Sequence, residues 1–108
     1  MNSLTLSKID EIIEQEDIVC IYLYTPMCGT CHLAGRMLEI VKELFPSVTF
    51  CKTDINYIPQ RAIEWGIESV PCLLIFFNRK LEKKIYAFQS VPYLYETIKA
   101  VSNRLDEQ

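Results

Sequence analysis

Two cysteines, Cys28 and Cys31, are separated by two residues and are the part of this sequence best suited to chemistry. Such a pair can cycle between dithiol and disulfide when one sulfur is a thiolate near neutral pH and the other can attack a mixed disulfide. The chain has five cysteines, an odd number that cannot all pair internally. The sequence therefore predicts one working pair rather than a framework of structural disulfides.

Metal binding is an alternative interpretation of the same residues. Zn²⁺ in proteins takes four ligands, whereas Cys28, Cys31 and the neighbouring His32 supply at most three. The sequence has no second Cys-x-x-Cys and no further histidine to complete a site. Redox chemistry is therefore favoured, and no metal is expected.

The residues around the pair predict the elements that position it. Ile18–Tyr24 is a run of seven apolar residues, typical of a strand covered on both faces. Thr25-Pro26 ends this strand, and a long helix begins at the Cys-Gly-Thr-Cys turn. The buried side of that helix is expected to carry Leu33, Met37, Ile40, Val41 and Leu44.

A helix start suits the chemistry of the first cysteine. Unpaired backbone N–H groups and the positive end of the helix dipole favour negative charge on a sulfur placed there. Cys28 is therefore the predicted nucleophile. Cys31, one turn later, is predicted to attack the bond between Cys28 and a substrate sulfur. Gly29 lets the chain turn sharply at this point.

The rest of the chain predicts alternating helices and strands. Before the hairpin, the expected elements are a helix over Ser7–Glu16 capped by Ser7 with Asp10, a strand over Val48–Thr53, and a helix over Pro59–Trp65 closed by Gly66. After them come a strand over Leu73–Phe77, a tight connection at Asn78-Arg79-Lys80, a strand over Leu81–Phe88, and a helix capped by Ser90 that buries Leu94, Ile98, Val101 and Leu105.

Strands separated by helices imply a parallel core, and the hairpin adds an antiparallel edge. The predicted fold is an α/β sandwich with a mixed sheet of about four strands, in a single domain over residues 1–108.

Composition and charge exclude several function classes. Half of the 108 residues are hydrophobic, and 11 Lys and Arg stand against 14 Asp and Glu, for a net charge of −3. This composition supports a folded core, and its mild acidity argues against nucleic-acid binding. The longest apolar runs, Ile18–Tyr24 and Val70–Phe77, are shorter than the ~20 residues of a membrane span. Because the first residues also lack a signal-peptide pattern, we expect a cytoplasmic protein with no membrane partner.

Two motifs stand at a separation that identifies a family. The first is Tyr24-Thr25-Pro26-Met27 followed by Cys28-Gly29-Thr30-Cys31. The second is Ala62-x-x-Trp65-x-Ile67-x-x-Val70-Pro71, continued by Leu73-Leu74-Ile75-Phe76. Together they make nearly the whole chain resemble the thioredoxin family. The resemblance implies a thioredoxin-like three-layer sandwich and a thiol–disulfide oxidoreductase that reduces disulfides in partner proteins. It also implies that the Val70–Pro71 peptide bond is cis and faces Cys28.

The same resemblance implies the other features of the site. Gly29, Thr30, Val70, Pro71 and Lys52 are expected to support the two cysteines. No cofactor is expected to be bound, and electrons are expected from NADPH through a reductase such as thioredoxin reductase, or from a low-molecular-weight thiol. The expected partners are disulfide-containing proteins, and the chain is expected to be monomeric and bacterial.

Several residues depart from the family pattern. Tyr22 stands where thioredoxins carry a buried Asp, and a tyrosine with a pKa of ~10 does not readily accept the proton of the resolving cysteine. Lys52 corresponds to the lysine that accompanies that Asp. Met27 replaces a tryptophan, and Thr30 and Arg36 replace prolines. These departures concern the redox potential and recognition by thioredoxin reductase. They motivate an alternative function, a redox-responsive binding module that does not turn over.

Four further residues have a chemical and a structural interpretation. His32 is the only histidine, and an exposed helix residue is favoured over a charge that assists the thiolate. Cys72 follows the expected cis-proline, and core packing is favoured over glutathionylation or a side disulfide. Cys20 and Cys51 fall in strands and are predicted to be buried thiols without function.

Overall fold

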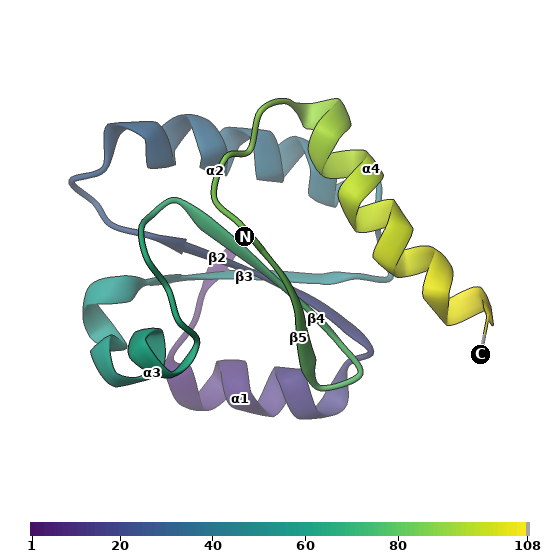
Figure 1. Cartoon of the computed structure of the whole chain (residues 1–108), viewed down its shortest axis with the longest axis horizontal. Coiled ribbons are helices and arrows are strands. Elements are labelled where there is room, and N and C mark those ends of the chain that lie inside the picture. Colours follow the sequence, from purple (N-terminus) through teal and green to yellow (C-terminus); the bar gives the residue numbers. More distant parts are fainter. Residues whose placement is uncertain (108) are drawn as a thin grey trace.

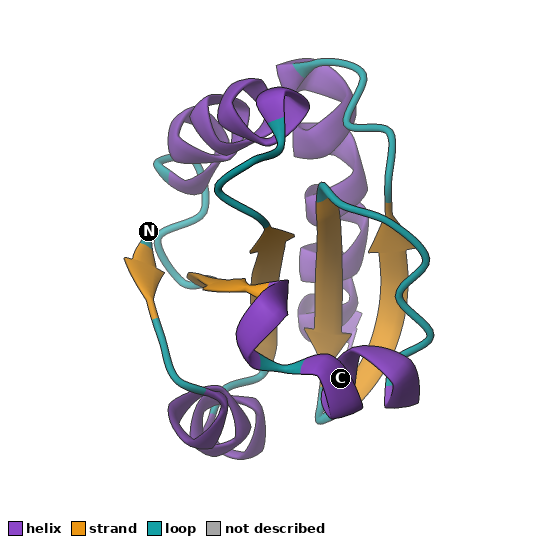
Figure 2. Ribbon diagram, turned by 90° about the vertical axis from the view of Figure 1, so that its left-hand side faces the viewer, coloured by secondary structure: helices purple, strands orange, loops and turns teal. Residues whose placement is uncertain are grey.

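A mixed sheet with helices on both faces forms the centre of the computed structural model, which describes residues 1–107 (Figure 1). Within these residues the sheet has five strands in the order β1-β3-β2-β4-β5. Helices α2 and α4 cover one face, and α1 and α3 cover the other (Figure 1 and Figure 2). The elements in chain order are β1 (Asn2–Ser3), α1 (Leu6–Gln15), β2 (Ile18–Tyr24), α2 (Gly29–Lys42), β3 (Thr49–Asp54), the 3₁₀ turn η1 (Ile55–Tyr57), α3 (Pro59–Glu64), β4 (Cys72–Phe77), β5 (Lys80–Ile85), α4 (Val91–Ser102) and the 3₁₀ turn η2 (Asn103–Glu107).

This architecture confirms the predicted α/β sandwich, with one strand more than the four expected. The additional strand is β1, in which Asn2 pairs in parallel with Cys51 of β3. Two residues are too few to show any hydrophobic periodicity, so the sequence could not predict this strand. The expected parallel core consists of β1, β3 and β2, and β4 with β5 forms the expected antiparallel hairpin at the edge.

Strand β4 also runs antiparallel to the central strand β2, with Leu23 opposite Cys72. The connection through η1 and α3 returns the chain to the end of the sheet where β2 and β3 finish, and β4 starts there. As a result, the start of β4 lies beside the loop that leads into α2.

The alternation of side chains along β2 divides the core in two. Ile18, Cys20 and Tyr22 point toward α2 and α4, and Val19 and Ile21 point toward α1 and α3. All are buried, because helices cover both faces of the sheet. Tyr22 consequently lies on the same face as the long helix that follows the two cysteines.

Helix α1 begins earlier than predicted. The side-chain oxygen of Thr5 accepts a hydrogen bond from the backbone N–H of Lys8 at 3.3 Å, so Thr5 is the cap. The predicted cap by Ser7 with Asp10 is wrong, because Ser7 already lies inside the helix. The carboxylate of Asp10 instead accepts a hydrogen bond from Arg61 of α3 at 3.0 Å and ties the two helices together.

Helix α2 turns a different face to the core than its periodicity predicts. Its buried residues are Cys31, Ala34, Leu38 and Val41. Of the five residues predicted to be buried, only Val41 is buried, and Met37 is half-buried. The other three are 54–57% exposed, namely Leu33, Ile40 and Leu44. The helix carries two apolar faces. The face with the smaller residues packs against the sheet and α4, because it allows a closer approach of the backbones.

The C-terminal part follows the prediction closely. Asn78 and Arg79 have positive φ values of 49° and 72° and form the tight turn between β4 and β5. The hydroxyl of Ser90 accepts a hydrogen bond from the N–H of Tyr93 at 3.1 Å and caps α4. Strand β5 ends at Ile85, three residues before the predicted end. The buried residues of α4 are Leu94, Ile98 and Val101, while Leu105 is only half-buried.

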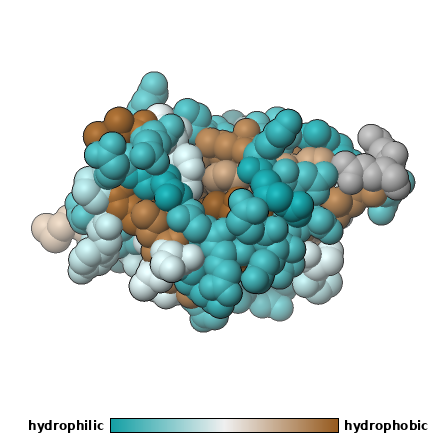
Figure 3. Space-filling view, turned by 90° about the horizontal axis from the view of Figure 1, so that it is seen from below, coloured by the Kyte–Doolittle hydropathy of each residue, from teal (hydrophilic) through white to brown (hydrophobic). Residues whose placement is uncertain are grey.

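The surface on the side of α1 and α3 is mainly hydrophilic, with scattered hydrophobic patches (Figure 3). Exposed charges of α1, such as Lys8, Glu11 and Glu14, contribute to it. Among residues 1–107 no helix combines the length and the hydropathy needed to cross a bilayer.

Candidate active site

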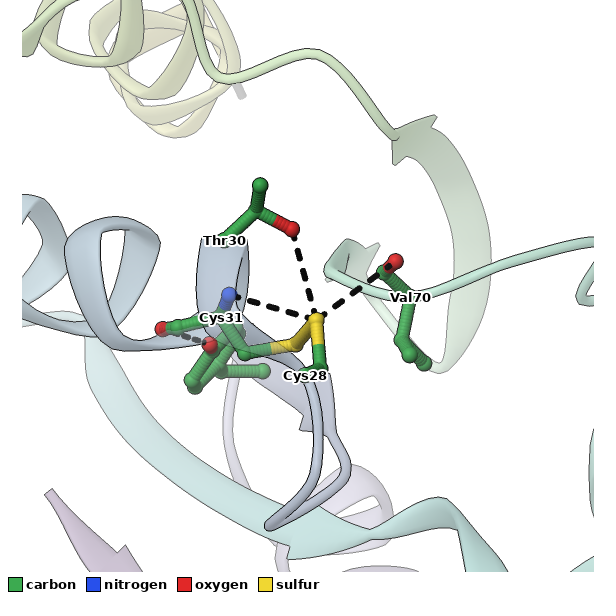
Figure 4. The surroundings of a disulfide bond; sticks show 5 residues. Cys28, Thr30, Cys31 and Val70 are labelled. Atoms are coloured by element: carbon green, nitrogen blue, oxygen red, sulfur yellow. Dashed lines mark hydrogen bonds between the residues drawn. A yellow bond between two sulfur atoms is a disulfide. The ribbon is translucent and has the colours of Figure 1, made fainter.

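Cys28 and Cys31 lie where the loop after β2 enters α2 (Figure 4). Cys28 is the N-cap residue, with extended backbone, and Cys31 lies in the first turn of the helix. Their Cα atoms are 5.3 Å apart, and their sulfurs are joined in a disulfide. The structure therefore places the pair at the predicted helix start and in a geometry that can open and close a disulfide.

The sulfur of Cys28 lies among groups that stabilise negative charge. The backbone N–H of Cys31 donates a hydrogen bond to it at 3.2 Å, and the hydroxyl of Thr30 lies 3.3 Å away. When the disulfide is reduced, these donors and the positive end of the helix dipole favour the thiolate form of Cys28. Thr30 thus contacts the sulfur of Cys28 directly (Figure 4).

The two sulfurs of the pair differ in access. Cys28 is half-buried, and the loop before it is open, because 95% of the surface of Met27 is exposed. Only 4% of the surface of Cys31 is exposed. A sulfur of another molecule can therefore approach Cys28, whereas Cys31 is accessible mainly to its own neighbour.

The segment before β4 faces Cys28. The Val70–Pro71 peptide bond is cis, and the carbonyl oxygen of Val70 lies 4.0 Å from the sulfur of Cys28. Beside them is a groove of about 310 Å³, lined by Thr30, Leu33 and Met37 of α2, by Pro71, and by residues 86–89. Sequence reasoning missed the contribution of residues 86–89. They lie far along the chain from the two cysteines, and no motif marks them.

Tyr22 lies behind the second cysteine. Its hydroxyl donates a hydrogen bond to the backbone carbonyl of Cys31, and only 3% of its surface is exposed. Burial, together with the neighbouring Tyr24, raises the pKa of Tyr22 to about 12. The sequence singled out Tyr22 as a departure from the family, but it did not predict this contact.

Lys52 lies on β3 opposite Tyr22 of β2. Its ammonium group is 5.5 Å from the centre of the Tyr24 ring, a cation–π contact. Lys52 and Tyr24 line a second cavity, of about 400 Å³, which is also lined by Cys31, His32 and Arg36. The His32 side chain is exposed on α2, as the favoured interpretation expected.

The other three thiols are buried in strands. Cys20, Cys51 and Cys72 are each at most 1% exposed, which confirms their predicted packing roles. Burial raises the pKa of Cys51 and of Cys72 to about 11 and also raises the pKa of Cys20. For Cys72 the burial effect prevails over nearby Lys84 and Tyr86, which act in the opposite direction. None of the three is therefore a thiolate at neutral pH.

Potential metal ligands are not clustered. In the part of the chain that the structure describes, no three His, Cys, Asp or Glu side chains are grouped so that they could hold a metal ion.

Comparison with known proteins gives the class to which this fold and site belong. The family model described as Thioredoxin matches residues 1–100. The chain belongs to the thioredoxin family, and its Cys28–Cys31 pair occupies the active-site position. It is a thiol–disulfide oxidoreductase of this family, as the two motifs implied.

Individual relatives support this assignment. The thioredoxin-like protein YusE of Bacillus subtilis is 48% identical over 103 residues, which is 95% of each chain. The oxidised form of mitochondrial thioredoxin 3 from Saccharomyces cerevisiae superposes with a TM-score of 0.83 at 27% identity, covering 93% of this chain and 94% of that one. A structure from work on the thiol resolving mechanism of yeast mitochondrial 1-Cys peroxiredoxin has a TM-score of 0.82 at 25% identity, with coverages of 93% and 94%.

Proposed function

We propose that this protein is a protein-disulfide reductase in which Cys28 is the nucleophile and Cys31 the resolving cysteine. The observation that carries the proposal is the unequal exposure of the two sulfurs, since Cys28 is half-buried and Cys31 is 4% exposed. An incoming disulfide can reach only the first of them. The hydrogen-bond donors around Cys28 are those that its thiolate needs.

In the first step the thiolate of Cys28 attacks one sulfur of a partner disulfide. A bond forms between Cys28 and that sulfur, the partner's own S–S bond breaks, and the second partner sulfur leaves as a thiolate that takes up a proton. The partner segment would lie in the groove beside Pro71. There the carbonyl of Val70 can accept a hydrogen bond from an extended chain, and Gly29 leaves the approach open, because nothing lies within 4 Å of the position of a Cβ there.

In the second step the thiolate of Cys31 attacks the sulfur of Cys28. The Cys28–Cys31 disulfide forms, the bond to the partner breaks, and the partner is released with two electrons gained. Reduction of the Cys28–Cys31 disulfide then needs two electrons from outside. Their proposed source is NADPH through a reductase such as thioredoxin reductase, or a low-molecular-weight thiol, with no bound cofactor in this chain.

The proposed partners are disulfide-containing proteins. The similar yeast structure from work on peroxiredoxin thiol resolution supports this choice of partner class. We further propose that the protein is cytoplasmic, bacterial and monomeric, and that residues 1–108 form one domain. The 48% identity with the Bacillus subtilis relative over 95% of both chains supports a bacterial origin.

A reduction assay on a model protein disulfide tests the function. With dithiothreitol as electron donor, the protein is expected to accelerate reduction of the disulfide, and a second assay with NADPH and thioredoxin reductase identifies the donor. Acceleration with dithiothreitol alone would exclude that reductase as the partner. No acceleration in either assay, with a Cys28–Cys31 disulfide that still forms, would instead support the binding module that does not turn over.

A trapping experiment tests the roles of the two sulfurs. Cys31→Ser is expected to accumulate mixed disulfides with partner proteins through Cys28, because the resolving attack is missing. The matched control is the double variant Cys28→Ser/Cys31→Ser, which should trap nothing. Equal trapping by Cys28→Ser alone would contradict the assigned roles, and trapping by Cys28→Ser but not by Cys31→Ser would reverse them.

A further inference from the structure

We propose that Tyr22 is a positioning residue for the resolving cysteine, because its hydroxyl fixes the first turn of α2 so that the sulfur of Cys31 stays within reach of Cys28. The inference rests on the proposed function and adds to it a residue that acts through Cys31 rather than on the substrate. It follows from the contacts of Tyr22 with two separate turns of α2.

The first contact is the hydrogen bond from the Tyr22 hydroxyl to the carbonyl oxygen of Cys31. It joins the central strand β2 to the helical turn that carries the resolving sulfur. Both residues are almost fully buried, so the hydrogen bond forms inside the protein rather than at its exposed surface. Loss of the hydroxyl would leave the carbonyl with one fewer partner and the turn without its tie to the sheet.

The second contact is made by the ring. A Cβ at Gly35, one turn further along α2, would lie 3.5 Å from the edge of the Tyr22 ring, so the glycine and the ring are close neighbours. The ring also stacks on Tyr24 at 5.6 Å and meets Phe88 edge-to-face at 6.0 Å. These contacts fix the ring, and the ring in turn fixes the direction of its hydroxyl.

The step that depends on this arrangement is the intramolecular attack of Cys31 on Cys28. In this attack the Cys31 thiolate bonds to the sulfur of Cys28, and the partner sulfur leaves with the electron pair of the broken bond. Its rate depends on how closely the two sulfurs are held in the attacking geometry. A first turn that moves relative to β2 lowers the effective concentration of Cys31 at Cys28. It therefore also disfavours the closed disulfide at equilibrium.

The decisive variant is Tyr22→Phe, which removes one oxygen and keeps the ring contacts. We expect the equilibrium constant for closing the Cys28–Cys31 disulfide, measured against dithiothreitol, to fall about tenfold, which is about 30 mV in potential. The release of a small chromogenic thiol from its mixed disulfide with Cys28 should slow by a similar factor. The matched control is Tyr95→Phe, because Tyr95 packs on Phe45 away from the cysteines and should leave both quantities unchanged.

This design separates positioning from stability. If Tyr22 only stabilised the fold, its loss would destabilise the oxidised and reduced proteins equally, and the equilibrium constant would not change. A Tyr22→Phe protein within twofold of the parent in both measurements would overturn the proposal, whatever its melting temperature. Because only small thiols take part in both measurements, this result is independent of whether the protein reduces protein disulfides.

The pH profile gives a second criterion. Since the pKa of Tyr22 is raised to about 12, its hydroxyl keeps its proton throughout the working range. The ratio of parent to Tyr22→Phe is therefore expected to stay constant from about pH 6 to about pH 9. A ratio that changed over this range would overturn the proposal in favour of a titrating group around the adjoining cavity. The charged and titratable groups there are the thiol of Cys31 in the reduced protein, Tyr24, His32, Arg36, Glu39, Lys52 and the amino group of Met1.

Discussion

Cys28 and Cys31 stand at the start of a helix, whereas Cys20, Cys51 and Cys72 stand in strands of the sheet. The first of the pair receives hydrogen bonds and is half-buried. The three strand thiols are covered on all sides, and burial raises their pKa. The same side chain is thus the proposed nucleophile in one place and a small hydrophobic residue in the other.

The difference teaches that the backbone around a cysteine decides its chemistry in this protein. A helix start offers free N–H groups to a thiolate, while the N–H groups inside a sheet are already paired with neighbouring strands. Cys72 makes the point most sharply, because it follows Pro71, which lines the groove beside Cys28, and is nevertheless 0% exposed.

The largest expected contrast is in activity. Cys28→Ser should lower the rate of protein-disulfide reduction at least about 1,000-fold, because a serine hydroxyl is not ionised at neutral pH and cannot replace the thiolate. Cys20→Ala should keep the rate within about twofold, because Cys20 is fully buried in β2 and does not line the substrate groove. The two rates measured in the dithiothreitol assay test the contrast. A large loss in Cys20→Ala with an intact fold would contradict it.

Alkylation of the reduced, folded protein sharpens the same comparison. Iodoacetamide at neutral pH is expected to label Cys28 at least about 100-fold faster than any strand thiol, which must first be exposed by local opening. Mass spectrometry of peptides after a time course gives the individual rates. In denaturant all five cysteines should react at similar rates. Early labelling of Cys72 in the folded protein would show that the groove gives access to it.

Alkaline pH should destabilise the fold through the buried thiols. The ordinary thiol pKa is 9.0, and in the folded protein burial raises the pKa of Cys51 and Cys72 to about 11. Above the ordinary value the unfolded chain therefore binds fewer protons than the folded one. The free energy of unfolding then falls as pH rises, by up to about 1.4 kcal/mol per pH unit for each thiol, until the folded pKa is passed.

Urea unfolding of the oxidised protein at several alkaline pH values measures this slope, since the Cys28–Cys31 disulfide does not titrate. Cys51→Ala serves as the control. It removes one buried thiol, so the unfolding free energy should fall less steeply with pH, by the contribution of that thiol. An identical slope in this variant would show that the buried thiols are not the cause.

The smallest expected effect is on stability at neutral pH. Cys20→Ser places a hydroxyl at a fully buried position and should lower the free energy of unfolding by about 1–3 kcal/mol. Cys28→Ser in the reduced protein should change it by less than about 0.5 kcal/mol, because that position is partly exposed and serine is a good helix cap. Chemical denaturation of both variants gives the comparison, and a reversed order would contradict the assigned roles.

Much of the site could be predicted because its signals are local. The apolar run of β2 and the Cys-Gly-Thr-Cys helix start are read from neighbouring residues, and the family motifs implied the cis bond before Pro71. The α2 face could not be predicted. Its sequence carries two apolar stripes, and only the packing of α2 on the sheet and on α4 selects the one with Ala34 and leaves Leu33 exposed.

The sequence by itself determined that two of the five cysteines form a redox pair, that the fold is an α/β sandwich, and that Cys28 stands at a helix start. Those conclusions depend on spacing and on composition within short windows. Only the tertiary structure decided that Cys31 is buried behind Cys28, that residues 86–89 complete the groove, and that the hydroxyl of Tyr22 binds the carbonyl of Cys31. These are contacts between distant parts of the chain. They follow from how the helices pack on the two faces of the sheet, which no local pattern encodes.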